Sequence, residues 1–406
     1  MAGGIFKMTT FGPNAFVVVE GKQAKSFYII RQGKVRLTNE IPIPGEEPSK
    51  ILGPGDFFGV VSCMSGHPHI ETAQTLTQVP VIEVGRDQFG VLIQKNAPIA
   101  MKIIRYFSLR LRVIDKAITQ LSFHHTVEED PRLMFDVGEY YFNKQEYRQA
   151  AYAFQKFLQY FSQDPRAAQA KVRLQGMNAP FQHPGIKRQG LNVSFNDGET
   201  IFIEHEPGSE LYIIQSGRVK ITKVVDQNEV LLAVLNPGDI FGEMALLENK
   251  PRSASAVAHG PVTALAINKA NFETMVQAQP QLAVKLITIL SERIWTAYRQ
   301  LANLLIEDPV GRMYDMLLTL IQKKRIPIQP KASYTFDIGP QELMNMIGIS
   351  PEKSESYIIA LLEDKNFKLD EGKIICLDTA ELEKQVHFYR KKAALDRKRD
   401  MARQNM

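Results

Sequence analysis

The residues best suited to bind a small charged ligand lie in the segment 241–257, FGEMALLENKPRSASAV. Gly242 has no Cβ, so the backbone can approach a ligand closely at this point. The Glu243 carboxylate can accept a hydrogen bond from a sugar hydroxyl, and the planar guanidinium of Arg252 can bind two phosphate oxygens. Ser253 adds a hydroxyl donor. These residue types together predict a pocket for a small ribose phosphate.

A short helix is expected at residues 244–250, with its first free N–H groups and its dipole facing the anion. Taken alone, a glutamate at a helix start is usually a solvated charge, and a single arginine is usually a surface residue. The combination is much more specific. The residues predicted to bind the ligand are Gly242, Glu243, Met244, Ala245, Arg252, Ser253 and Ala254.

This segment closely resembles the phosphate-binding cassette of cyclic-nucleotide-binding domains, which occur in Crp/Fnr-type regulators and in cyclic-nucleotide-dependent kinases. The resemblance implies that Glu243 holds the ribose 2′-hydroxyl and that Arg252 holds the cyclic phosphate. It also implies a cyclic nucleotide effector, with cyclic AMP as the expected ligand, cyclic GMP as the alternative and no metal.

Length and composition indicate a folded multidomain protein. A chain of 406 residues with 44% apolar residues is expected to form roughly two to four domains. The N-terminus lacks the apolar core of a signal peptide, and no run of about 18 apolar residues is present, so we expect a cytoplasmic protein without a membrane partner. Cys63 and Cys376 form neither a metal-ligand cluster nor a disulfide framework. The formal charge of +5 permits contact with nucleic acid but does not argue for it.

An internal repeat precedes the cassette. Residues 15–59 and 200–242 both show short alternating strands separated by glycine-containing turns, the pattern of a small β-barrel or jelly roll. Gly33 matches Gly217, and Gly55 matches Gly238. The resemblance implies that each copy is the eight-stranded roll that precedes a cassette. The chain is therefore expected to contain two rolls.

The first copy of the cassette, residues 59–70, differs at the positions that would bind the ligand. Val60 replaces the ribose-binding glutamate, and His69 stands at the position of Arg252. Neutral histidine binds phosphate poorly near pH 7. We therefore predict a roll that keeps the fold without the ligand. The alternative is a different anionic ligand bound through His67 and His69.

A long amphipathic segment follows each roll, with apolar residues at spacings of three and four that are typical of a coiled-coil seam. These residues are Ile104, Phe107, Leu111, Ile114, Ile118 and Leu121 in the first, and Ile287, Leu290, Ile294, Ala297, Leu301 and Leu304 in the second. The resemblance implies dimerisation helices that also close the nucleotide pocket. We expect either an intramolecular pseudo-dimer of the two rolls or a homodimer, unless each stripe packs only on its own roll.

Trp295 and Tyr298 lie on the second of these segments. Their position near the expected pocket predicts that they cap a purine ring by stacking. Packing into the core is the alternative for both aromatic side chains.

Residues 131–174, between the two rolls, show helical-hairpin spacing of Gly138, Tyr141, Tyr147, Ala150 and Phe154. This pattern resembles a tetratricopeptide repeat. Only about one repeat is present, whereas solenoids usually need three or more. The segment is therefore predicted to be a spacer docked on its neighbours rather than an independent peptide-binding surface.

The C-terminal part reads as an amphipathic helix after Asp308, then helix, turn and helix, then a hairpin around residues 370–372. Ser350 is the predicted N-cap of the second of the paired helices and Pro351 its first residue. This order resembles the winged helix-turn-helix of Crp/Fnr regulators.

DNA binding would require basic or amide side chains on that second helix. Between residues 341 and 364 the only basic residue is Lys353, against five acidic ones. The residues predicted to contact DNA are Lys353, Ser354, Ser356 and Tyr357, with phosphate contacts from the basic tail that starts near Arg390.

The predicted fold is an α+β multidomain protein. Its segments are a degenerate cyclic-nucleotide-binding-like domain (1–124), a tetratricopeptide-like insert and linker (125–186), a cyclic-nucleotide-binding domain (187–306), a winged helix-turn-helix (307–386) and a basic tail (387–406). We predict a cyclic-nucleotide-responsive transcription regulator, in which the long helix relays ligand binding to the DNA-binding module. The alternative is a nucleotide-sensing adaptor that holds a protein partner. No Walker loop, HExxH motif or nucleophile–base pair suggests an enzyme.

Overall fold

The computed structural model describes residues 6–41, 43–44, 46–123, 130–177, 187–225, 228–243, 250–347, 349 and 351–404. The chain divides into two units. Unit 1 comprises Met1–Phe89, Val113–Ile118 and Ser291–Met406, and unit 2 comprises Gly90–Arg112 and Thr119–Leu290. Over the described ranges, the chain contains no helix that is long and apolar enough to cross a membrane.

The first roll, in unit 1, consists of two four-stranded sheets with strand orders β1-β8-β3-β6 and β2-β7-β4-β5. Buried and exposed side chains alternate along β4, as expected for a strand with one face on a core. Val35 and Leu37 are buried in the hydrophobic core of the roll, whereas Arg36 is exposed. The strands are β1 (Lys7–Phe11), β2 (Phe16–Val18), β3 (Ser26–Ile30), β4 (Val35–Thr38), β5 (Ser49–Leu52), β6 (Phe57–Phe58), β7 (Thr72–Thr75) and β8 (Val79–Gly85). The cassette helix α1 (Val60–Ser65) lies between β6 and β7.

The second roll, in unit 2, forms one seven-stranded sheet with the order β13-β12-β15-β10-β9, to which β11 and β14 are attached. It is continuous because β12 and β15 are long enough to pair with several partners each, with register shifts along them. The strands are β9 (Lys187–Gln189), β10 (Asn192–Phe195), β11 (Thr200–Phe202), β12 (Glu210–Val225), β13 (Asn228–Leu235), β14 (Ile240–Phe241) and β15 (Ser255–Asn268).

The two matched glycines of the repeat are required for the same physical reason. Gly33 and Gly217 adopt φ angles of +88° and +81°, and a Cβ would lie 2.5 Å from the Gln78 carbonyl oxygen in the first roll and 2.1 Å from the Pro261 carbonyl oxygen in the second. Only glycine avoids both the backbone strain and the collision. The structure thus confirms that the repeat predicted from the sequence consists of two β-rolls.

Helical segments follow each roll: η1 (Arg86–Gln88), α2 (Phe89–Lys95) and α3 (Ala97–Phe123) after the first, and α8 (Lys269–Ala278) and α9 (Pro280–Leu304) after the second. The predicted apolar stripes on α3 and α9 are buried at most positions, including Phe107 and Leu290. Each long helix contributes residues to both units, since residues 113–118 of α3 and 291–304 of α9 belong to unit 1.

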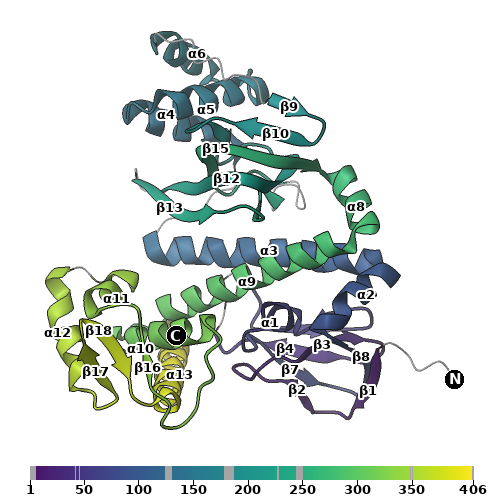
Figure 1. Cartoon of the computed structure of the whole chain (residues 1–406), viewed down its shortest axis with the longest axis vertical. Helices are drawn as coiled ribbons and strands as arrows, with labels where there is room; N and C mark the ends of the chain where they lie inside the picture. Colours follow the sequence, from purple (N-terminus) through teal and green to yellow (C-terminus); the bar gives the residue numbers. More distant parts are fainter. Residues whose placement is uncertain are drawn as a thin grey trace. The chain divides into compact units, whose positions relative to one another are not determined.

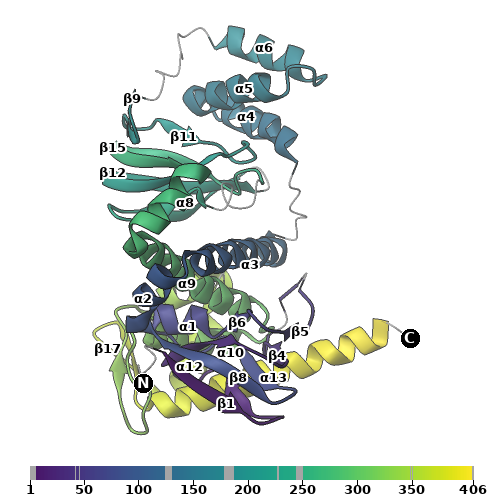
Figure 2. The same ribbon diagram turned by 90° about the vertical axis from the view of Figure 1, so that its right-hand side faces the viewer.

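The insert, in unit 2, contains η2 (Pro131–Leu133), α4 (Met134–Asn143), α5 (Tyr147–Tyr160) and α6 (Ala167–Gly176). Figures 1 and 2 show these helices stacked beside the sheet of the second roll. Gly138 lets α4 approach α5, because a Cβ there would lie 2.8 Å from the Phe154 ring. The insert shares a hydrophobic core with Ile203 of the second roll, so it is docked on that roll, as the sequence predicted.

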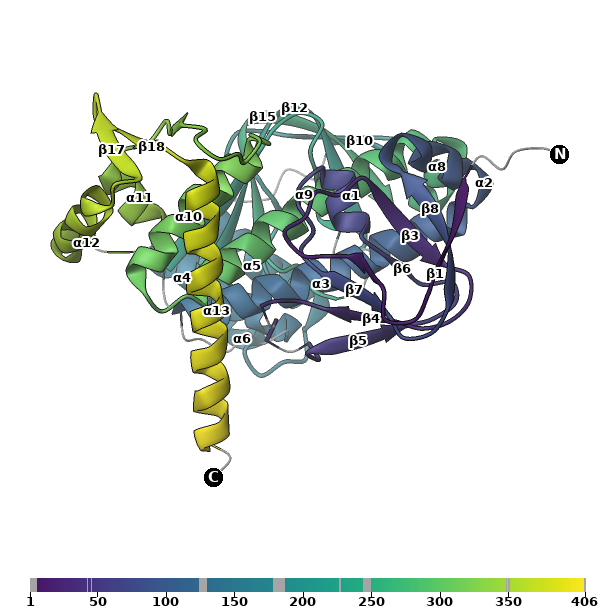
Figure 3. The same cartoon turned by 90° about the horizontal axis from the view of Figure 1, so that it is seen from below.

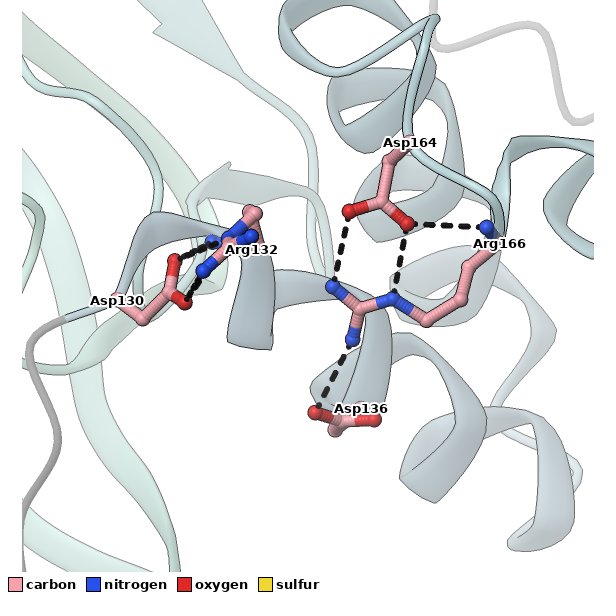
Figure 4. Close-up of polar contacts among 5 residues, drawn as sticks. All are labelled: Asp130, Arg132, Asp136, Asp164 and Arg166. Carbon is pink, nitrogen blue, oxygen red and sulfur yellow. Dashed lines mark hydrogen bonds and ion pairs between the residues drawn. The ribbon is translucent and has the colours of Figure 1, made fainter.

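An arginine fixes the helices of the insert to one another. Arg166 donates two hydrogen bonds to Asp164, at 3.0 and 3.2 Å, and forms an ion pair with Asp136 of α4 at 3.7 Å (Figure 4). Its guanidinium also lies 5.3 Å from the Phe135 ring centroid and 5.4 Å from that of Phe157, on α4 and α5. Because contacts from one side chain reach both helices, the insert is braced around the start of α6.

The C-terminal module, in unit 1, begins with Asp308 as N-cap and Pro309 as the first residue of α10, the helix boundary predicted from the sequence. The hairpin expected around residues 370–372 is present, with Asp370 paired to Lys373. The helix α13, which runs to the C-terminal end in Figure 3, packs against α10. The elements are α10 (Pro309–Lys323), β16 (Tyr334–Thr335), α11 (Pro340–Met346), α12 (Pro351–Glu363), β17 (Phe367–Asp370), β18 (Lys373–Cys376) and α13 (Thr379–Gln404).

Candidate functional site: two cassettes

Arg252 of the second roll is buried, with 5% of its surface exposed. Its Nη1 donates to the carbonyl oxygen of Gly242 at 2.6 Å, and its Nη2 donates to the carbonyl oxygen of Glu210 at 2.7 Å. The guanidinium carbon lies 4.1 Å from the centroid of the Phe202 ring, a cation–π arrangement. The Arg252 guanidinium is therefore held at the cassette by two carbonyl oxygens and the face of one aromatic ring.

Gly242 is required by this geometry. It adopts φ +75°, and a Cβ would lie 2.6 Å from Arg252 Nη1 and 3.2 Å from Phe202. The next residue, Glu243, is 1% exposed, and its carboxylate is close enough to act electrostatically on the Arg252 guanidinium. Ala254 is buried and Ser253 is half-buried. Met244 and Ala245, which were predicted to bind the ligand, lie outside the described residues, as does most of the short helix expected at 244–250.

The electrostatics of Arg252 favour an anion. Burial lowers the pKa of the guanidinium, and the nearby Tyr212 and Glu206 act in the opposite direction. An arginine nevertheless remains charged in proteins. Its buried Nε has no hydrogen-bond partner among the described residues. A buried cation with an unsatisfied N–H group is costly, and an anionic oxygen would satisfy it. The residues present therefore fit a phosphate.

The backbone of Arg252 is fixed by a short antiparallel pairing. Arg252 N–H donates to the carbonyl oxygen of Glu206, and His205 N–H donates to that of Arg252, both at 2.9 Å. Pro207 and Pro251 form the adjoining bridge. The segment before β12 thus sets the position from which the guanidinium extends.

The first cassette is filled by protein side chains. Val60, at the position of Glu243, is 2% exposed. The ring of His67 stacks on that of Trp295 with centroids 4.1 Å apart, and its Nε2 lies 2.7 Å from Glu292. His69 is 7% exposed, and burial lowers its pKa, which favours the neutral ring at pH 7. These contacts favour the prediction that this roll has lost the phosphate site.

The structure corrects the prediction that Trp295 and Tyr298 cap a purine in the second roll. Both lie in unit 1, are 1% and 0% exposed, and contact the first roll. Trp295 Nε1 donates to the carbonyl oxygen of Pro68 at 3.2 Å, and the Tyr298 hydroxyl donates to Glu20 at 2.8 Å. Because these polar groups are already bonded to the first roll, the two rings serve as core residues there.

A matching contact occurs in unit 2. Arg112 lies on the long helix that follows the first roll. Both of its Nη atoms donate to the carbonyl oxygen of Pro251, each at 3.4 Å. Pro251 and Pro68 occupy the same position in the two cassettes, since each precedes the matched pair Arg252 and His69. In each unit, therefore, a cassette contacts the long helix of the other roll.

A buried cluster of polar side chains, whose partners the sequence does not indicate, connects three helices in unit 1. Asp315 of α10 is 0% exposed and accepts hydrogen bonds from Arg299 of α9 and Arg390 of α13, at 3.1 and 2.7 Å. Asn303 of α9 donates to the same carboxylate at 3.2 Å. The burial of Arg390 removes this residue from the predicted phosphate contacts, because its guanidinium is bonded inside the module, whereas Lys391 and Lys392, the next residues of the tail, are exposed.

The residues predicted to contact DNA differ in exposure. Ser354 is 3% exposed with its Oγ 3.4 Å from Gln341, so the structure removes it from the predicted contact surface. Tyr357 packs partly against the core of the module, whereas Ser356 is exposed. Lys353 lies on α12. The predicted turn residue Gly348 and N-cap Ser350 lie outside the described residues.

The family model described as "Cyclic nucleotide-binding domain" matches the chain twice, at residues 8–96 and 192–279. Both rolls are thus domains of the cyclic-nucleotide-binding class. Within the part that the structure describes, no group of three or more His, Cys, Asp or Glu side chains could hold a metal ion.

Among known proteins, the chain is 30% identical over 203 residues to a "CRP-like cAMP-activated global transcriptional regulator" of Mycobacterium tuberculosis, covering 50% of this chain and 90% of that protein. It is 31% identical over 190 residues to the "Cyclic AMP receptor protein" of Thermus thermophilus, covering 47% and 85%. The crystal structure of the Thermus thermophilus catabolite activator protein matches at 30% identity with a TM-score of 0.29, covering 49% of this chain and 90% of that one. The chain belongs to the CRP-like family of regulators.

Proposed function

We propose that the protein is a cyclic-nucleotide-responsive transcription regulator whose second roll binds the nucleotide, cyclic AMP in the first instance. The observation that supports this most directly is the buried guanidinium of Arg252, which bonds to the Gly242 carbonyl oxygen, interacts electrostatically with Glu243 and has no partner for its Nε among the described residues. The names of the relatives from Mycobacterium tuberculosis and Thermus thermophilus point to the same effector.

Binding would proceed by exchange of hydrogen bonds at Arg252. The cyclic phosphate would accept from Nε and displace at least one of the carbonyl oxygens that the fork now holds. Each charge-assisted bond contributes about 1.5–3 kcal/mol where water is excluded. The Glu243 carboxylate would accept from the ribose hydroxyl. No catalytic step follows in this proposal, so the protein acts as a sensor and not as an enzyme.

The relay would run along α9. This helix begins in unit 2 and continues into unit 1, where Trp295 and Tyr298 contact the first roll. One turn further, Arg299 and Asn303 bond to Asp315 of α10. A displacement of α9 would therefore reach the C-terminal module directly. The nucleotide must bind one position of α9 more tightly than the other, because equal affinity would shift no population.

The C-terminal module would be the output. We infer that α11, α12 and the β17–β18 hairpin form a winged helix-turn-helix, with Ser356 and Lys353 on the helix that would enter the major groove. Lys368 on β17 and Lys373 on β18 are exposed, and they could contact phosphates from the wing.

A protein-interaction adaptor is the second candidate, and a specific observation favours it. The surface of α12 exposes Ile359 (51%) and Leu362 (37%) next to the acidic Glu355 and Glu363. Exposed apolar groups suit a protein partner, whereas acidic groups repel the DNA backbone. On this alternative, nucleotide binding would expose or hide α12 for a partner.

A gel-shift experiment with genomic DNA fragments, with and without cyclic AMP, distinguishes the two candidates. A regulator would retard a subset of fragments only with cyclic AMP, and Arg252→Ala would abolish the response. Nucleotide binding by calorimetry without any retarded fragment would exclude the regulator and favour the adaptor. Absence of nucleotide binding would exclude both.

A further inference from the structure

The segment 201–206 of the second roll supports Arg252 from two directions. Phe202 places its ring against the guanidinium, with 4.1 Å from the guanidinium carbon to the ring centroid. The backbone of His205 and Glu206 pairs with the backbone of Arg252. Any displacement of this segment would therefore move both the side chain and the main chain of the residue that is expected to bind phosphate.

The same segment is held from its other side by the insert. The hydroxyl of Tyr152 on α5 donates to Glu206 Oε2 at 2.9 Å and lies 3.2 Å from the Ile201 carbonyl oxygen. Lys156, one turn along α5, lies 3.1 Å through Nζ from Glu206 Oε1. Ile203 is 0% exposed and belongs to the core of the insert. The insert thus contacts both ends and the middle of the segment.

These contacts are buried, so each hydrogen-bond donor to the Glu206 carboxylate contributes to its stability. Tyr152 and Glu206 are each 6% exposed. A buried carboxylate is costly unless it is hydrogen-bonded, and here the donors are Tyr152, Lys156 and the backbone N–H of Ile203 at 3.1 Å. Two of the three come from the insert. The insert itself is braced through Arg166 (Figure 4), so it presents these donors on a fixed helix.

We propose that the insert is part of the nucleotide site of the second roll, with Tyr152 as a positioning residue for Arg252. Through its contacts with Glu206 and Ile201, α5 holds the segment 201–206 in the conformation that keeps the Phe202 ring against the Arg252 guanidinium and orients that guanidinium at the cassette. The proposal rests on the function proposed above for Arg252. It assigns to the insert a direct effect on nucleotide affinity rather than the role of a spacer.

The test compares Tyr152→Phe with Tyr160→Phe in the full chain. Both changes remove one hydroxyl from α5, but Tyr160 is 41% exposed. Calorimetry with cyclic AMP is expected to give a Kd at least five-fold higher for Tyr152→Phe and within two-fold of the parent for Tyr160→Phe. The titrations are made at a temperature at which circular dichroism shows each variant fully folded, so a loss of stability alone would leave the Kd unchanged.

Two further measurements identify which idea fails. In the Arg252→Ala background, Tyr152→Phe should have no additional effect on the Kd, because both changes act on one interaction. Without nucleotide, Tyr152→Phe should accelerate hydrogen exchange of the Arg252 amide, which donates to Glu206. If the parent binds cyclic AMP and Tyr152→Phe binds equally well, the positioning role is refuted. If the parent does not bind, the proposed function fails, and unchanged exchange would then refute the support of Arg252 independently.

Discussion

Replacing Trp295 by Phe should destabilise the contact between α9 and the first roll without direct loss of nucleotide affinity. The ring is 1% exposed, stacks on His67 and donates from Nε1 to the Pro68 carbonyl oxygen at 3.2 Å. Phe keeps a ring against His67 but loses about 40–50 Å² of buried apolar surface, which corresponds to about 1 kcal/mol. The lost hydrogen bond adds about 1 kcal/mol rather than more, because Pro68 keeps the Ser62 hydroxyl at 3.1 Å.

The expected decrease in the free energy of unfolding of unit 1 is therefore about 2 kcal/mol. Trp295 is the only tryptophan, so the parent can be followed by its fluorescence, but the comparison needs urea unfolding by circular dichroism with hydrogen exchange of first-roll peptides. Phe388→Leu is the control, because Phe388 is 60% exposed. A decrease below about 0.5 kcal/mol, or one equal to that of the control, would refute the reasoning. A ten-fold loss of cyclic AMP affinity with unchanged stability would instead restore the base-capping interpretation.

Two more substitutions test the second roll. Gly242→Ala should weaken cyclic AMP binding at least ten-fold, because its Cβ would lie 2.6 Å from Arg252 Nη1. The control Gly260→Ala should keep the affinity, because Gly260 has a similar φ of +79° but a Cβ there would have no atom within 4 Å. Equal affinities of the two variants would contradict this reasoning. Glu204→Gln tests a pH dependence, because burial raises the pKa of the Glu204 carboxyl from 4.5 to about 7. Between these values the unfolded chain ionises while the folded one stays protonated, so the parent should lose up to roughly 3 kcal/mol relative to the variant as the pH rises from 4.5 to 7. Parallel stability–pH curves from urea unfolding would show that the carboxyl titrates normally.

Local chemistry was predicted well from the sequence. The turn glycines Gly33 and Gly217 mark the repeat because their positive φ angles exclude other residues, and this requirement is visible in the spacing alone. The boundary at Asp308 and Pro309 was expected as a helix break, and the structure shows that these two residues are the N-cap and the first residue of α10. That Glu243 and Arg252 belong to one cassette also follows from short-range spacing, while their roles toward a ligand remain predictions. Each of these features depends on residues close in the chain.

The partners of long-range contacts could not be predicted from one sequence. Trp295 was expected on the roll that precedes it, yet it bonds to Pro68, 227 residues away. Amphipathic spacing shows which face of a helix is buried but not which surface buries it. The partner of Arg390 could not be predicted either. This residue lies in a strongly basic segment that looks solvent-exposed in the sequence, yet it bonds to the buried Asp315. Tyr152 and Glu206 gave no signal either, because a buried tyrosine–carboxylate pair has no fixed spacing.

Isothermal titration of the intact chain with cyclic AMP tests the central claim most directly. The account predicts one nucleotide per chain, bound at the second roll, and a Kd raised about 30-fold or more by Arg252→Ala, which corresponds to at least about 2 kcal/mol. His69→Ala, at the matching position of the first roll, should leave both the stoichiometry and the Kd unchanged. No heat of binding at 100-fold excess over micromolar protein, two nucleotides per chain, or unaltered binding by Arg252→Ala would contradict it.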